Sequence, residues 1–439
     1  MIKHELDGYV EYKDSGIDWV GKVPKHWNIV RIKEMSLINE KSLSQETSDD
    51  YSFDYVDISG VTYGTEGFIK ERITFKEAPS RARRIVRKGD TIISTVRTYL
   101  KAVTSINQEV FDLIVSTGFA VLSPKKNINP DYCSYLFKSE FIINEIAALS
   151  KGVSYPAINA SVIGNLFFIT PTIVEQTAIA KYLSRKTAQI DRKIDLLTQK
   201  AAKYTNFKES LISETVTKGL DKTASVRASG VEWIGEVPEH WFIKRGKDIF
   251  KQTKNKAGSD SSSYDVLSLT LKGVIKRDLD NMKGKIPESF DGYQITNINN
   301  LVLCLFDMDV TPRIVGYVNQ KGIITSAYTV LVGKYELDMK YYFYYFLEQN
   351  RNKSLLANSK TLRSTMTFDL FSQLQLPVPT IVEQQNIAEY LDTKTVQIDL
   401  IIESINTQID KLKELRKTLI NDVVTGKIKV TSIGDEEAI

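Results

Sequence analysis

The sequence is poor in residues and segments that mark several classes of protein. It contains two cysteines, Cys133 and Cys304, which lie far apart in apolar surroundings. This favours one buried thiol in each of two domains over a disulfide or a metal pair. The first residues lack the apolar core of a signal peptide, and no segment approaches about 18 uninterrupted apolar residues. We therefore expect a soluble, cytoplasmic protein.

The chain also lacks the motifs of enzymes that act on nucleic acids. It has no Pro-Pro pair, which an Asn/Asp-Pro-Pro-aromatic methyltransferase motif requires, and no Gly-Lys pair is followed by Ser or Thr as in a P-loop. Pro130-Asp131 begins like a nuclease motif, but no acidic-x-Lys sequence follows before Pro171. A self-sufficient methyltransferase or nuclease is disfavoured, and we expect no catalytic residues and no bound metal. Methyl transfer by the purified chain would overturn this.

Charge of one sign is not in excess either. The chain has 58 Lys and Arg against 54 Asp and Glu, so its net charge of +4 does not by itself indicate nucleic-acid binding. Any such indication has to come from local clusters. The 439 residues are too many for one ordinary core and predict two to four structural units.

What the chain does have is an internal repeat. Residues 16–31 match residues 230–245 at nine of sixteen positions, and residues 171–191 match residues 379–399 at fifteen of twenty-one. The segments between these blocks, residues 28–170 (module 1) and 242–378 (module 2), match poorly. We predict two similar scaffolds that carry two divergent modules of one fold. The two chain ends could together replace the linker that joins the copies, so we expect the termini to lie near each other.

Apolar residues fall into heptads from about residue 174 and again in the second copy, which indicates coiled-coil helices. The heptad positions are Leu183, Ile190, Leu197, Tyr204 and Leu211 with Ala180, Thr187, Ile194 and Ala201, then Leu391, Ile398, Ile405, Leu412 and Leu419 with Ala388, Thr395, Ile402 and Ile409. Pro-Thr before each run suits a helix start, and Gly219 and Gly426 suit the ends. We expect the two helices to pack antiparallel. Burial of each seam within its own module is the alternative.

The repeated blocks WVGKVPKHW and WIGEVPEHW hold two of the three histidines, His26 and His240. No Asp, Cys or Ser recurs at matching places in both copies, so a catalytic role is disfavoured. We interpret the blocks as docking elements that join module to helix, with each histidine packed as a structural residue.

Both modules mix short β-rich segments with turn residues and short helical stretches, which is typical of an α+β fold. Both also carry clusters of Lys and Arg, as phosphate contacts require, although a solvated charged face is the alternative. Our candidate DNA-binding residues are Arg81, Arg83, Arg84, Arg97, Lys101, Lys151 and Ser154 in module 1, and Lys254, Lys256, Lys272, Arg277, Arg313, Lys360 and Arg363 in module 2.

The ordered set of paired tryptophan blocks, paired PTIVEQ helix starts at residues 171 and 379, and Gly89-Asp90 before an Ile-Ile-Ser strand resembles the specificity subunit of type I restriction-modification systems. The resemblance covers essentially the whole chain. In module 2, Asn299-Asn300 stands where module 1 has Gly89-Asp90, which leaves the alignment of its recognition loops open.

The resemblance implies a non-catalytic subunit with two target recognition domains, each reading half of an asymmetric, bipartite site in double-stranded DNA. The helices would set the distance between the halves and bind two modification subunits, which bring S-adenosylmethionine and methylate adenine. Restriction subunits using ATP and Mg²⁺ would join for cleavage. The alternative is a coiled-coil adaptor that binds only proteins, which would not explain two divergent basic modules.

We therefore predict an α+β protein with an internal pseudo-twofold repeat, in which two recognition domains are separated by two long antiparallel coiled-coil helices. The expected segments are 1–27 (leader and first tryptophan block), 28–170 (first recognition domain), 171–218 (first helix), 219–241 (linker and second block), 242–378 (second recognition domain), 379–425 (second helix) and 426–439 (tail).

Overall fold

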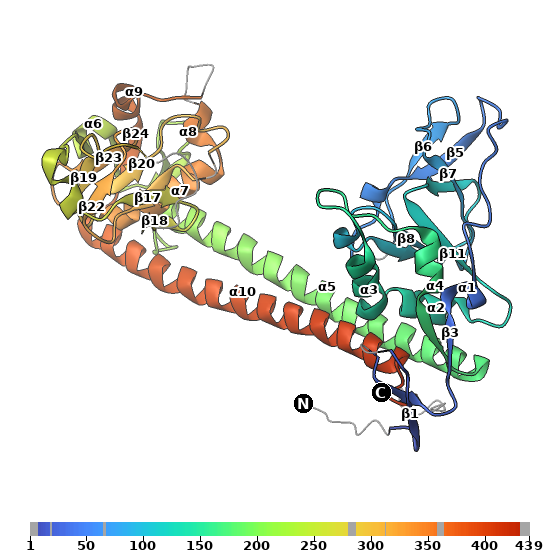
Figure 1. The fold of residues 1–439 in the computed structure, drawn as a ribbon. Coiled ribbons are helices and arrows are strands. Elements are labelled where there is room, and N and C mark those ends of the chain that lie inside the picture. Colours follow the sequence, from blue (N-terminus) through green and yellow to red (C-terminus); the bar gives the residue numbers. More distant parts are fainter. Residues whose placement is uncertain are drawn as a thin grey trace. The chain divides into compact units, whose positions relative to one another are not determined.

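The computed structural model describes residues 8–17, 20–64, 67–279, 287–311, 313–357 and 364–430. The chain divides into two compact units: unit 1 is Met1–Leu197 with Thr407–Ile439, and unit 2 is Thr198–Asn406. Each unit contains one module and one part of each long helix (Figure 1). Among the described residues, no helix has both the length and the apolar character needed to cross a membrane.

Module 1 consists of short strands with small helices around them. Its strands are β3 (Asn28–Arg31), β4 (Ser36–Ile38), β5 (Ser52–Val56), β6 (Glu71–Thr74), β7 (Ala82–Ile85), β8 (Thr91–Ser94), β9 (Val103–Ser105), β10 (Leu113–Ser116), β11 (Phe119–Pro124) and β12 (Phe167–Thr170). Its helices are α1 (Ile32–Met35), α2 (Pro130–Phe137), α3 (Glu140–Leu149) and α4 (Ala160–Asn165), with the 3-10 turns η1 (Ile58–Gly60) and η2 (Thr98–Leu100). One sheet has the order β4-β11-β8-β9 and another the order β6-β5-β10-β7. The predicted α+β class is confirmed.

Module 2 repeats this plan. Its strands are β15 (Phe242–Arg245), β16 (Phe250–Thr253), β17 (Leu267–Thr270), β18 (Gly273–Lys276), β19 (Gln294–Thr296), β20 (Leu301–Leu303), β21 (Val315–Tyr317), β22 (Gly322–Ile324), β23 (Thr329–Gly333) and β24 (Gln375–Val378). Its helices are α6 (Gly246–Ile249), α7 (Met339–Arg351), α8 (Ser354–Ala357) and α9 (Phe368–Gln373), with η3 (Gly258–Ser263). The sheet β16-β23-β20-β21 corresponds strand by strand to β4-β11-β8-β9. The two divergent modules therefore share one fold, as the repeat predicted.

The turns before strands β8 and β20 have the same backbone conformation although their residues differ. Gly89 has a φ of +91° and donates its N–H to Ile106 O at 2.8 Å. Asn299 has a φ of +69° and donates to Val318 O at 3.1 Å. Asparagine tolerates the left-handed region better than most residues, so it can replace glycine here. Asn299-Asn300 is thus the structural counterpart of Gly89-Asp90.

Each module leaves and rejoins the scaffold through one pair of antiparallel strands. In β3 and β12, Asn28 lies opposite Thr170. In β15 and β24, Phe242 lies opposite Val378. Both ends of a module therefore meet at one place in its unit, which makes each module a single insertion into the repeated scaffold.

Two tryptophan blocks and two long helices form that scaffold. The first block contains β2 (Lys22–Pro24), which pairs with β1 (Tyr12–Asp14) just before the block. The second contains β14 (Glu236–Pro238), which pairs in the same way with β13 (Val226–Ala228). The long helices are α5 (Ile173–Lys218) and α10 (Ile381–Val424). Every predicted heptad position on them is buried or half-buried, which confirms the coiled-coil pattern.

The long helices run antiparallel, as predicted. In unit 1, Arg416 near the end of α10 forms an ion pair with Asp191 in the first half of α5, at 2.9 Å. In unit 2, Lys208 near the end of α5 pairs with Asp399 in the first half of α10, at 2.7 Å. The alternative expectation also holds for part of the seam, because Leu183 is buried in the module core of its own unit. The seam thus serves both helix pairing and attachment of the modules.

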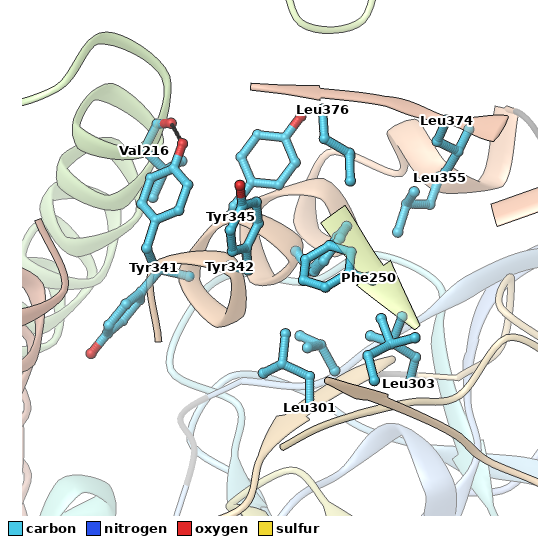
Figure 2. Close-up of a cluster of buried hydrophobic side chains, with 14 of the residues drawn as sticks. Val216, Phe250, Leu301, Leu303, Tyr341, Tyr342, Tyr345, Leu355, Leu374 and Leu376 are labelled. Carbon is cyan, nitrogen blue, oxygen red and sulfur yellow. Dashed lines mark hydrogen bonds between the residues drawn. The ribbon is translucent and has the colours of Figure 1, made fainter. Parts of the chain in front are cut away.

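The core of unit 2 shows how a helix end is built into a module. Helix α7 has the sequence MKYYFYYFLEQNR, and its tyrosine rings are buried against the sheet and the end of α5 (Figure 2). Most buried tyrosine hydroxyls have a polar partner. Tyr341 donates its hydroxyl to Val216 O on α5 at 3.1 Å, as Figure 2 shows.

The two cysteines, Cys133 and Cys304, are buried and form no disulfide, as expected.

Candidate nucleic-acid interface

At the start of α5, one carboxylate joins the first tryptophan block to the helix. Glu175 Oε1 lies 2.9 Å from His26 Nε2 and accepts a hydrogen bond from the Trp27 indole N–H at 3.3 Å. Its Oε2 accepts from the backbone N–H and the hydroxyl of Thr172, at 3.2 and 2.9 Å. This is a capping box with two additional partners. The predicted docking role is confirmed, but the His26 side chain is 50% exposed and is held by its hydrogen bond to Glu175 rather than by interior packing.

The second copy repeats the same arrangement at the start of α10. Glu383 Oε1 lies 2.7 Å from His240 Nε2 and accepts from the Trp241 indole N–H at 3.2 Å. Burial opposes ionisation of Glu175 and Glu383, but hydrogen bonds from the histidine, threonine and tryptophan outweigh it and lower the pKa of both carboxyls. Both carboxylates are therefore held in the charged form that their donors favour.

The glutamine that follows each of these glutamates attaches a module to the start of the helix: Gln176 on α5 and Gln384 on α10. Gln176 Oε1 accepts from the backbone N–H of Asn129, the N-cap of α2, at 2.8 Å, and its amide donates to Pro171 O at 3.0 Å. Gln384 accepts in the same way from Asp338, the N-cap of α7, at 3.0 Å. The repeated PTIVEQ sequence is thus a joint between module, block and helix.

The ends of the described chain lie together in unit 1, as expected. Tyr12 donates its hydroxyl to Gly426 O at 3.2 Å. A Cβ on Gly426 would come within 3.0 Å of the Trp27 ring, and a Cβ on Gly219 would come within 3.3 Å of the Trp241 ring. The end of α10 therefore meets the first block as the end of α5 meets the second. Residues near the two ends of the described chain thus form a junction that corresponds to the junction between α5 and the second block.

Five of the seven candidates in module 1 gather at one end of the module. The backbone joins their loops, because Thr117 donates its N–H to Arg81 O at 2.7 Å and Thr95 donates to Gly118 O at 2.8 Å. The segment 95–101 is in turn hydrogen-bonded to the segment 150–158, and we call these two segments together the paired loop. The candidates in this region are Arg81, Arg97, Lys101, Lys151 and Ser154.

These side chains differ in whether they already form ion pairs or hydrogen bonds within the protein. Arg81 forms an ion pair with Asp57 at 3.1 Å. Lys101 donates to Asn144 Oδ1 at 2.9 Å. The Arg97 guanidinium lies over the Tyr155 ring at 4.8 Å and is exposed, as are Lys151 and Ser154. The paired loop therefore presents the most accessible cations of this group.

Arg83 and Arg84 occupy a different setting, on strand β7. The Arg83 guanidinium lies 4.6 Å from the centre of the Phe75 ring. Arg84 donates to Ser42 Oγ at 3.2 Å, and partial burial lowers the pKa of its guanidinium. The structure does not bring these two residues together with the paired loop, and their contact with DNA stays a prediction.

The described candidates in module 2 are spread over several loops. Lys254 and Lys256 are exposed after β16, and Lys272 lies at the turn between β17 and β18. Lys272 and Arg313 line one cleft of about 160 Å³, and burial lowers the pKa of Arg313. The structure thus brings Lys272 and Arg313 together.

Three candidates of module 2 remain to be placed. Arg277 follows β18 and is half-buried. Lys360 and Arg363 lie outside the described residues.

A backbone pairing in module 2 resembles that of the paired loop. Met308 donates its N–H to Ser364 O at 3.3 Å, and Met366 donates to Leu305 O at 2.7 Å. In module 1, Arg97 donates to Pro156 O and Ile158 donates to Thr95 O. The same backbone pairing therefore recurs at this end of both modules.

Sequence reasoning missed two sets of residues. Glu175 and Gln176 were not singled out, although their presence in both copies of PTIVEQ was a usable signal. Val153 and Tyr155 in the paired loop were also missed. They stand in one copy only, and no pattern marks a lone exposed apolar residue before the fold is known.

Comparison with known proteins identifies the repeated unit. The family described as "Type I restriction modification DNA specificity domain" matches residues 24–203 and again 238–413. Two relatives come from Methanocaldococcus jannaschii. The putative type I restriction enzyme MjaX specificity subunit is 24% identical over 440 residues, covering 94% of this chain and 96% of the relative. The type I restriction enzyme MjaIX specificity subunit is 23% identical over 466 residues, covering 99% of each.

Solved structures share the fold. A chain from a structure described as the "structural basis underlying complex assembly and conformational transition of the type I R-M system" aligns with a TM-score of 0.70 at 19% identity, covering 92% of this chain and 98% of that one. The HsdS subunit from Thermoanaerobacter tengcongensis aligns with a TM-score of 0.53 at 20% identity, with the same coverage. The chain belongs to the type I restriction-modification DNA specificity family and carries two copies of its specificity domain.

Proposed function

We propose that this chain is the subunit of a type I restriction-modification complex that reads the DNA sequence, with module 1 and module 2 each reading one half of a bipartite target. The observation that carries the proposal is the contrast between the two copies. The joints at Glu175 and Glu383 are the same to within about 0.2 Å, whereas the module surfaces differ. A scaffold that repeats while its surface loops diverge suits a protein that recognises two different sequences in the same way.

The long helices would set the spacing between the two half-sites and dock partner subunits. Two outward apolar positions recur in both copies: Val174 corresponds to Val382, and Phe207 to Leu415, and all four are more than half exposed. Exposed apolar side chains at equivalent positions suit two copies of the same partner. We propose that these partners are two modification subunits, which the family resemblance implies.

The chemistry would belong to the partners. We propose that the modification subunits hold S-adenosylmethionine and methylate an extruded adenine, and that restriction subunits with ATP and Mg²⁺ carry out cleavage. The chain itself would supply sequence choice without catalysis. A coiled-coil adaptor that binds only proteins is not favoured, because both modules match a DNA specificity family.

Methylome mapping of cells that carry this chain with its modification partner tests the proposal. We expect methylated adenines in one bipartite motif whose halves differ and are separated by a fixed spacer. Methylation in a single unbroken motif, or none that depends on this chain, would contradict it. In vitro, binding of the complex to the mapped duplex should weaken steeply as salt rises.

A further inference from the structure

The paired loop of module 1, residues 95–101 and 150–158, forms a tip whose two segments are held together by backbone hydrogen bonds. Arg97 donates its N–H to Pro156 O at 2.8 Å, and Ile158 donates to Thr95 O at 2.9 Å. Within the second segment, Lys151 and Ala157 exchange two hydrogen bonds of 2.9 Å. Gly152 makes this tight turn possible, because its φ is +114° and a Cβ there would lie 3.2 Å from Tyr155 O.

The tip exposes several large apolar side chains. The exposed fractions are 102% for Val153, 66% for Tyr155, 56% for Tyr99 and 49% for Leu100. Isolated exposed apolar residues are common, but four on two hydrogen-bonded segments indicate a surface that is covered in use.

The same two segments carry three cations, Arg97, Lys101 and Lys151, and no Asp or Glu. Arg97 and Lys101 both have left-handed backbones, with φ of +50° and +53°, and they flank η2 on either side. Non-glycine residues persist in this region only where the surroundings fix them, often at ligand-binding sites. The Arg97 guanidinium is further oriented by the Tyr155 ring, 4.8 Å away.

A purely phosphate-binding tip would need cations but no apolar side chains, since phosphates are strongly hydrated anions. Base edges in the DNA groove offer both kinds of contact: acceptors for arginine and the methyl group of thymine for apolar side chains. The absence of acidic residues on the two segments suits the negative potential of a duplex better than an ordinary protein surface.

We propose that the paired loop reads base edges in the half-site of module 1, with Arg97 donating hydrogen bonds to a base and Val153 and Tyr155 contacting thymine methyl groups. This inference rests on the proposed function. It makes Arg97, Val153 and Tyr155 specificity-determining residues, of which the last two carry no charge.

The first test measures binding of the complete methyltransferase complex to the mapped duplex and to a duplex with the half-site of module 1 scrambled. That half-site is the one that stays unchanged when residues 242–378 are exchanged. Arg97→Ala should weaken binding to the target roughly fivefold to hundredfold. Binding to the scrambled duplex and the salt dependence should stay unchanged, because no phosphate contact is lost. Lys126→Ala, an exposed charge change elsewhere in module 1, is the matched control.

The second test replaces each thymine of that half-site with deoxyuridine, which removes only the methyl group. For at least one position, the unaltered complex should lose about fourfold in affinity, the value of one buried methyl group. Val153→Ala, at a fully exposed position that cannot disturb the core, should abolish that sensitivity. Phe111→Ala, 85% exposed, should leave it intact.

Equal losses on the target and the scrambled duplex, or a shallower salt dependence for Arg97→Ala, would assign Arg97 to phosphate contact and overturn the inference. Insensitivity to every thymine methyl group would overturn the role of Val153. Loss of a modification subunit with unchanged half-site preference would show that the tip binds protein instead. If the unaltered complex binds no bipartite duplex, the proposed function itself fails.

Discussion

At the residue scale, the joint between block, module and helix depends on adjacent side chains at each helix start. Glu175 accepts hydrogen bonds from His26, Trp27 and Thr172, while Gln176 holds the N-cap of α2. A buried donor that loses its acceptor costs more than the bond itself contributes, because the donor remains desolvated. The buried Trp27 indole N–H is such a donor.

Glu175→Gln should therefore destabilise unit 1 by about 1–2 kcal/mol, because the neutral amide is a weaker acceptor than the carboxylate. Thermal unfolding followed by tryptophan fluorescence would measure the change. Glu383→Gln is the matched variant in unit 2 and should have an effect of similar size. A change at one joint only would show that the two joints are not energetically equivalent.

The same carboxylates make the free energy of unfolding fall as the solution becomes acidic. Folding lowers the pKa of Glu175 and Glu383, so the folded state binds protons less readily than the unfolded state. Their contribution is fully present above the ordinary glutamate pKa of about 4.3 and is lost as the pH falls through the lowered folded values. The double variant Glu175→Gln with Glu383→Gln should show a flatter loss of stability below about pH 5. Parallel stability curves for both proteins would contradict this linkage.

At the element scale, the sequence predicted what depends on periodicity. The heptads predicted the two long helices α5 and α10, because an apolar repeat is a property of the chain itself. The strand order β4-β11-β8-β9 was not predictable, since strand pairing depends on contacts between distant residues. The accessible cations of the paired loop were named, but Tyr155, which orients Arg97, was found only once the two segments were seen together.

The antiparallel pairing makes helix length testable as the determinant of spacing. Asp191 pairs with Arg416 and Lys208 pairs with Asp399, so the same seventeen-residue step separates the contacts on both helices. One heptad inserted after Leu197 together with one after Ile409 should preserve the seam and lengthen each helix by about 10 Å. We expect the spacer in the methylated motif to grow by about three base pairs.

An insertion into one helix alone is the control for this experiment. It would place Lys208 or Arg416 out of register with its partner and should lower stability without giving a defined new spacer. An unchanged spacer after the double insertion would refute a measuring role for the helices.

At the scale of the whole molecule, each module is an insertion bounded by adjoining strand ends, Asn28 with Thr170 and Phe242 with Val378. Exchange of residues 242–378 for the module of another family member should therefore keep the scaffold and change only one half of the recognised sequence. Methylome mapping of the chimera measures this, and exchange of residues 28–170 is the reciprocal control. A change in both halves after either exchange would count against independent modules.

The two units also differ in whether they are formed by one segment of the sequence or by two. Unit 2 is one continuous segment, whereas unit 1 combines the first 197 residues with residues from 407 onward. Ile420, Val423 and Val424 on α10 complete the hydrophobic core that contains Trp27. At synthesis rates of about 5–20 residues per second, roughly ten to fifty seconds would pass between the synthesis of residue 197 and the end of the chain. During translation the first module thus waits with part of its core open, and a chain stopped early would leave the first-made unit incomplete while the later-made one is whole.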